Sequence, residues 1–288
     1  MRKGFLIGGG LILLGLMLQL GVGPVVWDAL AWPVNGIVMV AFLLLIAVCY
    51  LFRKKVSLFR FVGTYQAAIP ALVYAVLLTI VMGLIRQNPE GKWLENMLVF
   101  WPFVLIYVYM ALILGVVVVR QLVTVLSHFS LLTSHFSLLS HMGLFLAMTT
   151  ATLGNADMQR LKMVTTVGEQ EWRAVTSYGT IQEMPMTIEL KQFIMETYDD
   201  GSPKRFASEI LVRTKDNEEL QTTIDVNKPV EVDGWKIYQY SYDTQMGPQS
   251  QISILELVSD PWLPLVYTGI YMLLAGAVCM FIFGGKKK

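Results

Sequence analysis

Six long apolar stretches constrain the fold of this chain more than any other feature. A helix that spans a bilayer needs about 20 mostly apolar residues, and six segments meet that requirement: residues 4–26, 34–52, 62–85, 99–119, 132–153 and 262–284. Only 15% of the residues are charged, against about a quarter in soluble domains. We therefore expect an α-helical integral membrane protein with six transmembrane helices.

The charges are divided unevenly between one polar segment and the rest of the chain. Residues 155–260 hold ten basic and eighteen acidic residues, a net charge of −8, whereas the remainder holds twelve basic and three acidic residues, a net charge of +9. The two parts are expected to face opposite sides of a membrane. Because the whole chain carries only +1 and no basic run exceeds three residues, no nucleic-acid partner is expected.

The basic residues also predict the orientation. With a cytoplasmic N-terminus, ten of the twelve basic residues outside 155–260 fall on the inner side, and only Arg86 and Lys92 fall on the outer side. Cytoplasmic loops are rich in Lys and Arg, so both termini are expected in the cytoplasm and 155–260 in the periplasm, with the spans in a bacterial inner membrane. We interpret five tryptophans as anchors at the outer interface: Trp27, Trp32, Trp93, Trp101 and Trp262.

Four regions are expected along the chain: residues 1–60 with two transmembrane helices, 61–154 with helices three to five, 155–260 as an extracytoplasmic β-rich domain, and 261–288 with the last helix and a basic tail. Alternating polar and apolar residues predict strands in the third region. Examples are 186–191, 210–213, 222–226, 235–240 and 251–255. About eight strands in roughly 100 residues favour an inserted antiparallel β domain, either a sandwich or an open barrel.

Nothing in the β domain predicts catalysis. It contains no His and no Cys, which excludes a Ser/His/Asp or Cys/His arrangement within it. The two cysteines, Cys49 and Cys279, fall in predicted spans, and neither stands in a Cys-x-x-Cys motif. The chain itself is therefore neither a dithiol oxidoreductase of that kind nor a c-type cytochrome.

The three histidines fall within fourteen residues, at 128, 135 and 141. On a straight helix, His128 and His135 share a face while His141 points elsewhere, so one site made of all three is not expected. We interpret His128 and His135 as residues near the inner boundary that meet headgroups and water, with contact to a ligand left open. His141 lies deeper, inside the fifth span, where an ionisable side chain is costly and marks a functional candidate.

Two roles stay open for His141. A neutral imidazole is the usual axial ligand of haem iron, and it can also hydrogen-bond a neighbouring helix. Gly143, two residues later, would allow close approach of either a planar macrocycle or another helix.

Several segments resemble the ResB (CcsB) component of the System II cytochrome c biogenesis machinery, in the form found in Bacteroidetes-like bacteria. The resemblance covers most of residues 60–284 and rests on six segments in order: 63–70 (GTYQAAIP), 100–103 (FWPF), 140–161 (SHMGLF to DMQRL), 226–229 (VNKP), 234–243 (GWKIYQYSYD) and 260–269 (DPWLPLVYTG). Each segment alone is weak evidence for the resemblance, but the six segments in this order around one polar domain are specific to the family.

The resemblance implies a function in haem transport. Such a component works with a CcsA-type membrane protein, carries haem b across the inner membrane and presents it for covalent attachment to apocytochrome c. A transmembrane His provides one axial iron ligand and CcsA the other; carried over, that role falls on His141. The chain would then be a subunit of a cytochrome c haem lyase complex, not a catalyst alone, since it supplies no nucleophile.

The chain departs from this family pattern in three ways. It lacks the Trp-rich haem-handling motif of CcsA, it has more spans than the four of the common ResB form, and Phe-Ser-Leu-Leu is duplicated at 129–132 and 136–139. The resemblance leaves open whether the native protein is fused to CcsA.

Two other interpretations stay open. In the first, the protein is a membrane-anchored envelope ligand-binding or structural protein with no haem role, although six spans exceed what an anchor needs. In the second, it is a transporter, which would need paired charges or broken helices at mid-membrane. Pro70 could kink the third span, but no matching half-repeat is found.

Overall fold

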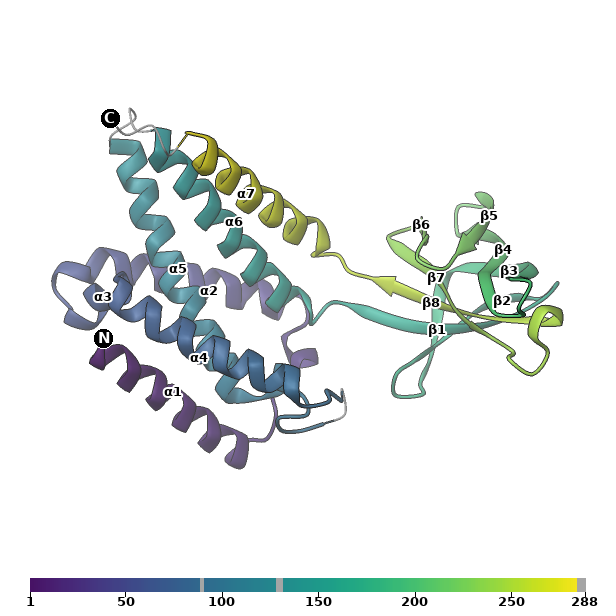
Figure 1. Cartoon of the computed structure of the whole chain (residues 1–288), viewed down its shortest axis with the longest axis horizontal. Coiled ribbons are helices and arrows are strands. Elements are labelled where there is room, and N and C mark those ends of the chain that lie inside the picture. The colour runs from purple at the N-terminus through teal and green to yellow at the C-terminus, as the bar shows by residue number, and fades with distance from the viewer. Residues whose placement is uncertain (89–90, 128–131, 284–288) are drawn as a thin grey trace. The chain divides into compact units, whose positions relative to one another are not determined.

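The computed structural model describes residues 1–88, 91–127 and 132–283. The chain divides into two compact units (Figure 1). The helical unit comprises Met1–Asp157 and Trp262–Lys288, and the β unit comprises Met158–Pro261. The helices of both expected N-terminal regions thus pack in one unit together with the C-terminal helix.

Six helices of the helical unit are long and apolar enough to cross a membrane, which makes the chain a multi-pass membrane protein. They are α1 (Arg2–Gly21), α2 (Val34–Leu51), α4 (Tyr65–Leu84), α5 (Trp101–Ser127), α6 (Leu132–Gly154) and α7 (Leu263–Phe283). Shorter elements connect them: α3 (Ser57–Val62) and the 3₁₀ turns η1 (Trp27–Leu30), η2 (Phe52–Lys54) and η3 (Met97–Val99).

The ends of two spans differ from the prediction. Helix α1 stops at Gly21 instead of residue 26, because Gly23 adopts a positive φ of 91° and Pro24 follows it. Helix α5 continues to Ser127, eight residues beyond the predicted end at 119. Polar residues do not end it, since Arg and Gln favour helices and the Arg120 guanidinium donates to the Gly63 carbonyl.

Helices α6 and α7 lie side by side in close contact (Figure 1). A Cβ atom on Gly143 of α6 would collide with the α7 backbone at Leu273 and Gly269, and one on Gly269 would lie 2.6 Å from the Ala147 nitrogen. Small residues that let backbones approach are typical of helix pairs in membranes. We call the end where α6 finishes and α7 begins the connection end, and the opposite end, where α5 finishes and α6 begins, the hairpin end.

The β unit is one eight-stranded antiparallel sheet in the order β5-β4-β3-β2-β1-β8-β7-β6. The strands are β1 (Gln159–Thr166), β2 (Gln170–Thr176), β3 (Ile181–Thr197), β4 (Pro203–Thr214), β5 (Glu219–Asp225), β6 (Val230–Val232), β7 (Trp235–Tyr242) and β8 (Ile252–Ser259). Strands β1 and β8 pair along their whole length, from Gln159 opposite Ser259 to Thr166 opposite Ile252.

The sheet curls upon itself. The Ser208 hydroxyl of β4 is within hydrogen-bonding distance of the Gln239 side-chain oxygen on β7 (2.6 Å) and the Ser253 hydroxyl on β8 (2.7 Å). Strand β4 is not a neighbour of β7 or β8 in the sheet. The curl encloses a core that includes Met163, Ile188, Ile210, Ile237 and Leu255. A single curled sheet corresponds to the open barrel of the two predicted alternatives.

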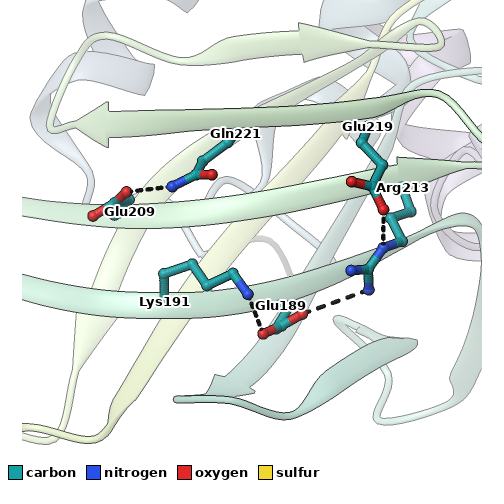
Figure 2. A network of polar contacts seen from close by, with 6 residues as sticks. All are labelled: Glu189, Lys191, Glu209, Arg213, Glu219 and Gln221. Carbon is teal, nitrogen blue, oxygen red and sulfur yellow. Dashed lines mark hydrogen bonds and ion pairs between the residues drawn. The ribbon is translucent and has the colours of Figure 1, made fainter.

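The outer surface near the β5 edge carries a polar network (Figure 2). The Glu189 carboxylate on β3 lies between Lys191 and Arg213, and Arg213 also donates to Glu219 on β5. A hydrogen bond from Lys191, with the nearby Arg213 charge, holds the pKa of Glu189 below its ordinary value. The acidic composition of this unit is thus partly balanced by cross-strand pairs on its surface.

Candidate functional site

His141 lies in the middle turns of α6, half-buried, and its ring nitrogens have different surroundings. Nδ1 is 2.7 Å from the backbone carbonyl oxygen of Ser137, one turn earlier. A carbonyl only accepts, so in the neutral imidazole Nδ1 carries the proton and Nε2 keeps its lone pair. No residue of the described chain hydrogen-bonds Nε2. Metal-binding histidines commonly have one nitrogen fixed by a carbonyl in this way.

Two side chains surround the Nδ1 side of the ring. The Gln121 amide nitrogen on α5 donates to the Ser137 hydroxyl at 3.0 Å and lies 3.5 Å from Nδ1. Its partner atom, Gln121 Oε1, is buried and has no donor within the described residues. A buried acceptor without a donor is costly, so a hydrogen-bond donor that reached this amide oxygen would be stabilising.

The face of α6 that carries His141 changes character along its length. Positions seven residues apart on a helix differ by about 20°, which places Ser134 and Met148 on the same face as His141. Toward the hairpin end this face is polar, with Ser134 and Ser137. Toward the connection end it is apolar, with Phe145, whose ring stacks on Phe42 of α2 at 6.4 Å.

An apolar cavity of about 660 Å³ begins beyond the Phe42–Phe145 pair, in the half of the helical unit nearer the connection end. Helices α2, α4, α5, α6 and α7 line it, with Phe42, Met82, Phe103 and Met148 among the contacts. Its size falls within the range of about 300–1,000 Å³ found for small-molecule sites. His141 does not line this cavity.

Gly143 packs against α7 and does not open a space beside His141. The close approach of Leu273 and Gly269 occupies the position where its side chain would stand. Of the two roles that the sequence left open for Gly143, the structure shows helix packing.

Asp157, just beyond α6, is a polar junction that the sequence analysis missed. Its carboxylate accepts hydrogen bonds from the Trp32 backbone N–H (2.7 Å), the Asn35 amide (2.7 Å) and the Trp262 indole (2.6 Å). Burial acts to raise its pKa, but the three hydrogen bonds outweigh it and lower the pKa. The junction ties together α2, α6 and α7 at the connection end. Trp32 and Trp262, which the sequence analysis interpreted as interfacial anchors, both donate hydrogen bonds to Asp157.

The other described candidate residues do not join His141. His128 lies outside the described residues, and so does the predicted face that it shares with His135. His135 lies on α6, half-buried and with an interaction partner of its own. Cys49 and Cys279 are both free thiols. Within residues 1–88, 91–127 and 132–283, no three His, Cys, Asp or Glu side chains gather as a metal site.

Part of the chain, including the helix that carries His141, is similar to a known protein family. Residues 125–253 match the model of the ResB-like family, a range that includes α6 with His141 and most of the β unit. This part of the chain is therefore similar to a ResB-like domain. No curated protein matches the chain.

Among solved structures, the chain is similar to the cytochrome c heme lyase CcmF, with a TM-score of 0.37 and 15% sequence identity. The alignment covers 85% of this chain and 44% of that one. The chain therefore spans less than half the length of that protein.

Proposed function

We propose that this protein is a haem-handling subunit of a cytochrome c biogenesis complex and that His141 is an axial ligand to the iron of transported haem b. The observation that carries the proposal is the state of the imidazole: Nδ1–H is held by the Ser137 carbonyl, which leaves the Nε2 lone pair available. The ResB-like match, which includes this helix, supports the same function.

The surroundings of His141 suit such a ligand. An imidazole whose proton is held on one nitrogen by a hydrogen bond is a stronger metal ligand through its other nitrogen. The rings of Phe145 and Phe42 supply aromatic surface nearby. Among the described residues, the hydrogen-bond partners of His141 are Gln121 and Ser137, and neither side chain is a strong iron ligand. We therefore propose that a CcsA-type partner completes the coordination.

In the covalent attachment of haem to apocytochrome c, the role of this chain is to orient the reactants, because the reacting groups belong to haem and the substrate. The cysteine thiols of the substrate add to the vinyl groups of haem, and the protein contributes position. We propose that the helical unit holds haem within an inner membrane. The β unit then lies in the periplasm and positions the apocytochrome.

The test is a visible absorption spectrum of the protein purified with its CcsA-type partner. A Soret band is expected in the wild type and in His135→Ala, which controls for removal of a neighbouring histidine from the same helix. We expect His141→Ala to lose most of the bound haem and to regain it when imidazole is added. A colourless wild-type complex would contradict the proposal and favour a membrane-anchored envelope ligand-binding or structural protein.

A further inference from the structure

A small polar pocket lies beside His141, toward the hairpin end of the helical unit. Its volume is about 240 Å³, and its lining comes only from α5 and α6: Arg120, Gln121, Thr124, Ser134 and Ser137. One cation, one amide and three hydroxyls make a donor-rich cluster in a segment whose other surfaces are mainly apolar. This composition suits anionic oxygen atoms.

The pocket adjoins the surroundings of His141. Ser137 carries the carbonyl that holds Nδ1, and Gln121 lies 3.5 Å from the same nitrogen. Ser134 is seven residues before His141 and therefore lies on the same face of α6, about 10 Å nearer the hairpin end. The pocket therefore lies next to the side of the imidazole that carries Nδ1, along the same face of α6.

Arg120 supplies the positive charge of the pocket. One of its guanidinium nitrogens donates to the Gly63 carbonyl at 2.9 Å, and no carboxylate pairs with it among the described residues. The described acidic residues of the helical unit, Asp28, Glu95 and Asp157, all lie near the connection end. The remaining N–H groups of Arg120 are thus free for a ligand.

Two hydroxyls add donors to the same pocket. Ser134 makes no hydrogen bond to any residue described, and Ser137 accepts from Gln121 with its own proton still to donate. By contrast, the Thr124 hydroxyl donates to the Arg120 carbonyl of its own helix. Arg120, Ser134 and Ser137 are therefore the groups that would contact a bound anion.

Haem is an amphiphile with two carboxylates on one edge and vinyl groups elsewhere on the ring. We infer that the Arg120 pocket binds the carboxylates of a haem whose iron is on His141, so that the opposite edge points toward Phe145 and the connection end. This inference rests on the proposed function. It adds a direction: the acidic edge faces the hairpin end, and the vinyl-bearing part faces the end from which the chain enters the β unit.

The test compares haem with haem dimethyl ester, in which both carboxylates are blocked. Binding is measured by spectroscopic titration of the complex with its partner, reconstituted in nanodiscs of zwitterionic lipid. Because a hydrogen bond to a charged group contributes roughly a factor of ten or more, we expect Arg120→Gln to weaken haem binding about tenfold. The same variant should bind the ester as tightly as the wild type does.

Three further variants make the result interpretable. Ser134→Ala should weaken haem binding by a smaller factor without disturbing the bond to Gly63, which guards against a folding defect in Arg120→Gln. Arg120→Lys should restore part of the affinity. Arg60→Gln is the matched control, because Arg60 lies at the same end of the unit and donates to the Lys54 carbonyl; it should bind both ligands like the wild type.

Phospholipid phosphate shares the chemistry of the carboxylates, so a second arm uses nanodiscs with anionic lipid. If Arg120→Gln loses retained anionic lipid but binds haem normally, the pocket is a lipid site and the inference is wrong. If it weakens haem and ester equally, the carboxylates are not the ligand. His141→Ala separates the two proposals: loss of haem there, with no effect of Arg120→Gln, overturns only the orientation of haem, whereas a wild type that binds no haem overturns both.

Discussion

The helical unit and the β unit solve the problem of buried polar groups in different ways. In α6, the hydroxyls of Thr149, Thr150 and Thr152 donate back to carbonyls one turn earlier on their own helix. In the β unit, Ser208, Gln239 and Ser253 bond one another across strands. Polar side chains therefore hold the curled sheet closed. Most polar side chains of α6 bond their own helix instead, and apolar and small residues make most of the contacts between helices.

The difference shows why His141 stands out. Its Nδ1 follows the rule of the helical unit and bonds a carbonyl of its own helix, but Nε2 has no such partner within the described chain. In the β unit every buried hydroxyl near the core has a partner. In the described helical unit, by contrast, the buried side-chain oxygens of Tyr109 and Gln121 on α5 have no hydrogen-bond partner, and Gln121 lies beside His141.

The largest effect should come from removing the close approach of α6 and α7. Gly143→Leu places a side chain where the α7 backbone at Leu273 and Gly269 already stands, and overpacking of this kind costs about 3 kcal/mol or more when neither backbone can move. We expect little folded protein on size-exclusion chromatography in detergent and a much lower melting temperature. Gly83→Leu on α4, where nothing lies within 4 Å, is the control, and equal melting temperatures for the two variants would refute the packing argument.

The next effect should come from the junction at Asp157, where the helical unit does use a polar group between helices. Asp157→Asn replaces a charged acceptor of three hydrogen bonds, and we expect a loss of about 1.5–3 kcal/mol, the contribution of hydrogen bonds to charged groups. Asp28→Asn, on an exposed carboxylate, should leave the melting temperature unchanged.

The junction also predicts a pH dependence. Because the folded-state pKa of Asp157 is lowered, its contribution is fully present above the pKa of the unfolded state, near 3.9, and is lost as the pH falls toward the folded value. Thermal unfolding of the wild type between pH 7 and pH 2 should show this decline only below about pH 4. Asp157→Asn should lack this part of the decline; an unchanged pH profile would argue against the junction.

The sequence predicted much of this architecture because apolar length and strand alternation act locally. All six spans and the strands around 186–191, 210–213 and 235–240 follow from such patterns. The Asp157 junction could not be predicted, since Trp32, Asn35 and Trp262 come together only through tertiary packing. His141 could be predicted in part. Its position inside a span follows from the sequence, whereas the contact of Nδ1 with the Ser137 carbonyl depends on the side-chain rotamer.

A smaller effect is expected in the β unit from its buried hydroxyl cluster. Ser208→Ala removes a hydroxyl that lies 2.6 Å from Gln239 Oε1 and 2.7 Å from Ser253 Oγ, and the free energy of unfolding should fall by about 1–2 kcal/mol. Ser253 still lies within reach of Gln239 at 3.1 Å, which limits the loss. Ser177→Ala, at an exposed position of the β2–β3 turn, is the control. A loss no larger than in that control would show that the cluster does not hold the curl.

The smallest effect should come from the surface network around Glu189, where water competes with each pair. Lys191 and Arg213 are both about one-third exposed, so Glu189→Gln should cost less than about 1 kcal/mol at pH 7. The pKa of Glu189 is lowered by its bond from Lys191 and by Arg213, so the contribution exists above the ordinary Glu pKa and disappears as the pH falls through the folded value. The melting temperatures of Glu189→Gln and wild type should therefore differ slightly at pH 7 and converge near pH 3, and a gap that widens on acidification would contradict this account.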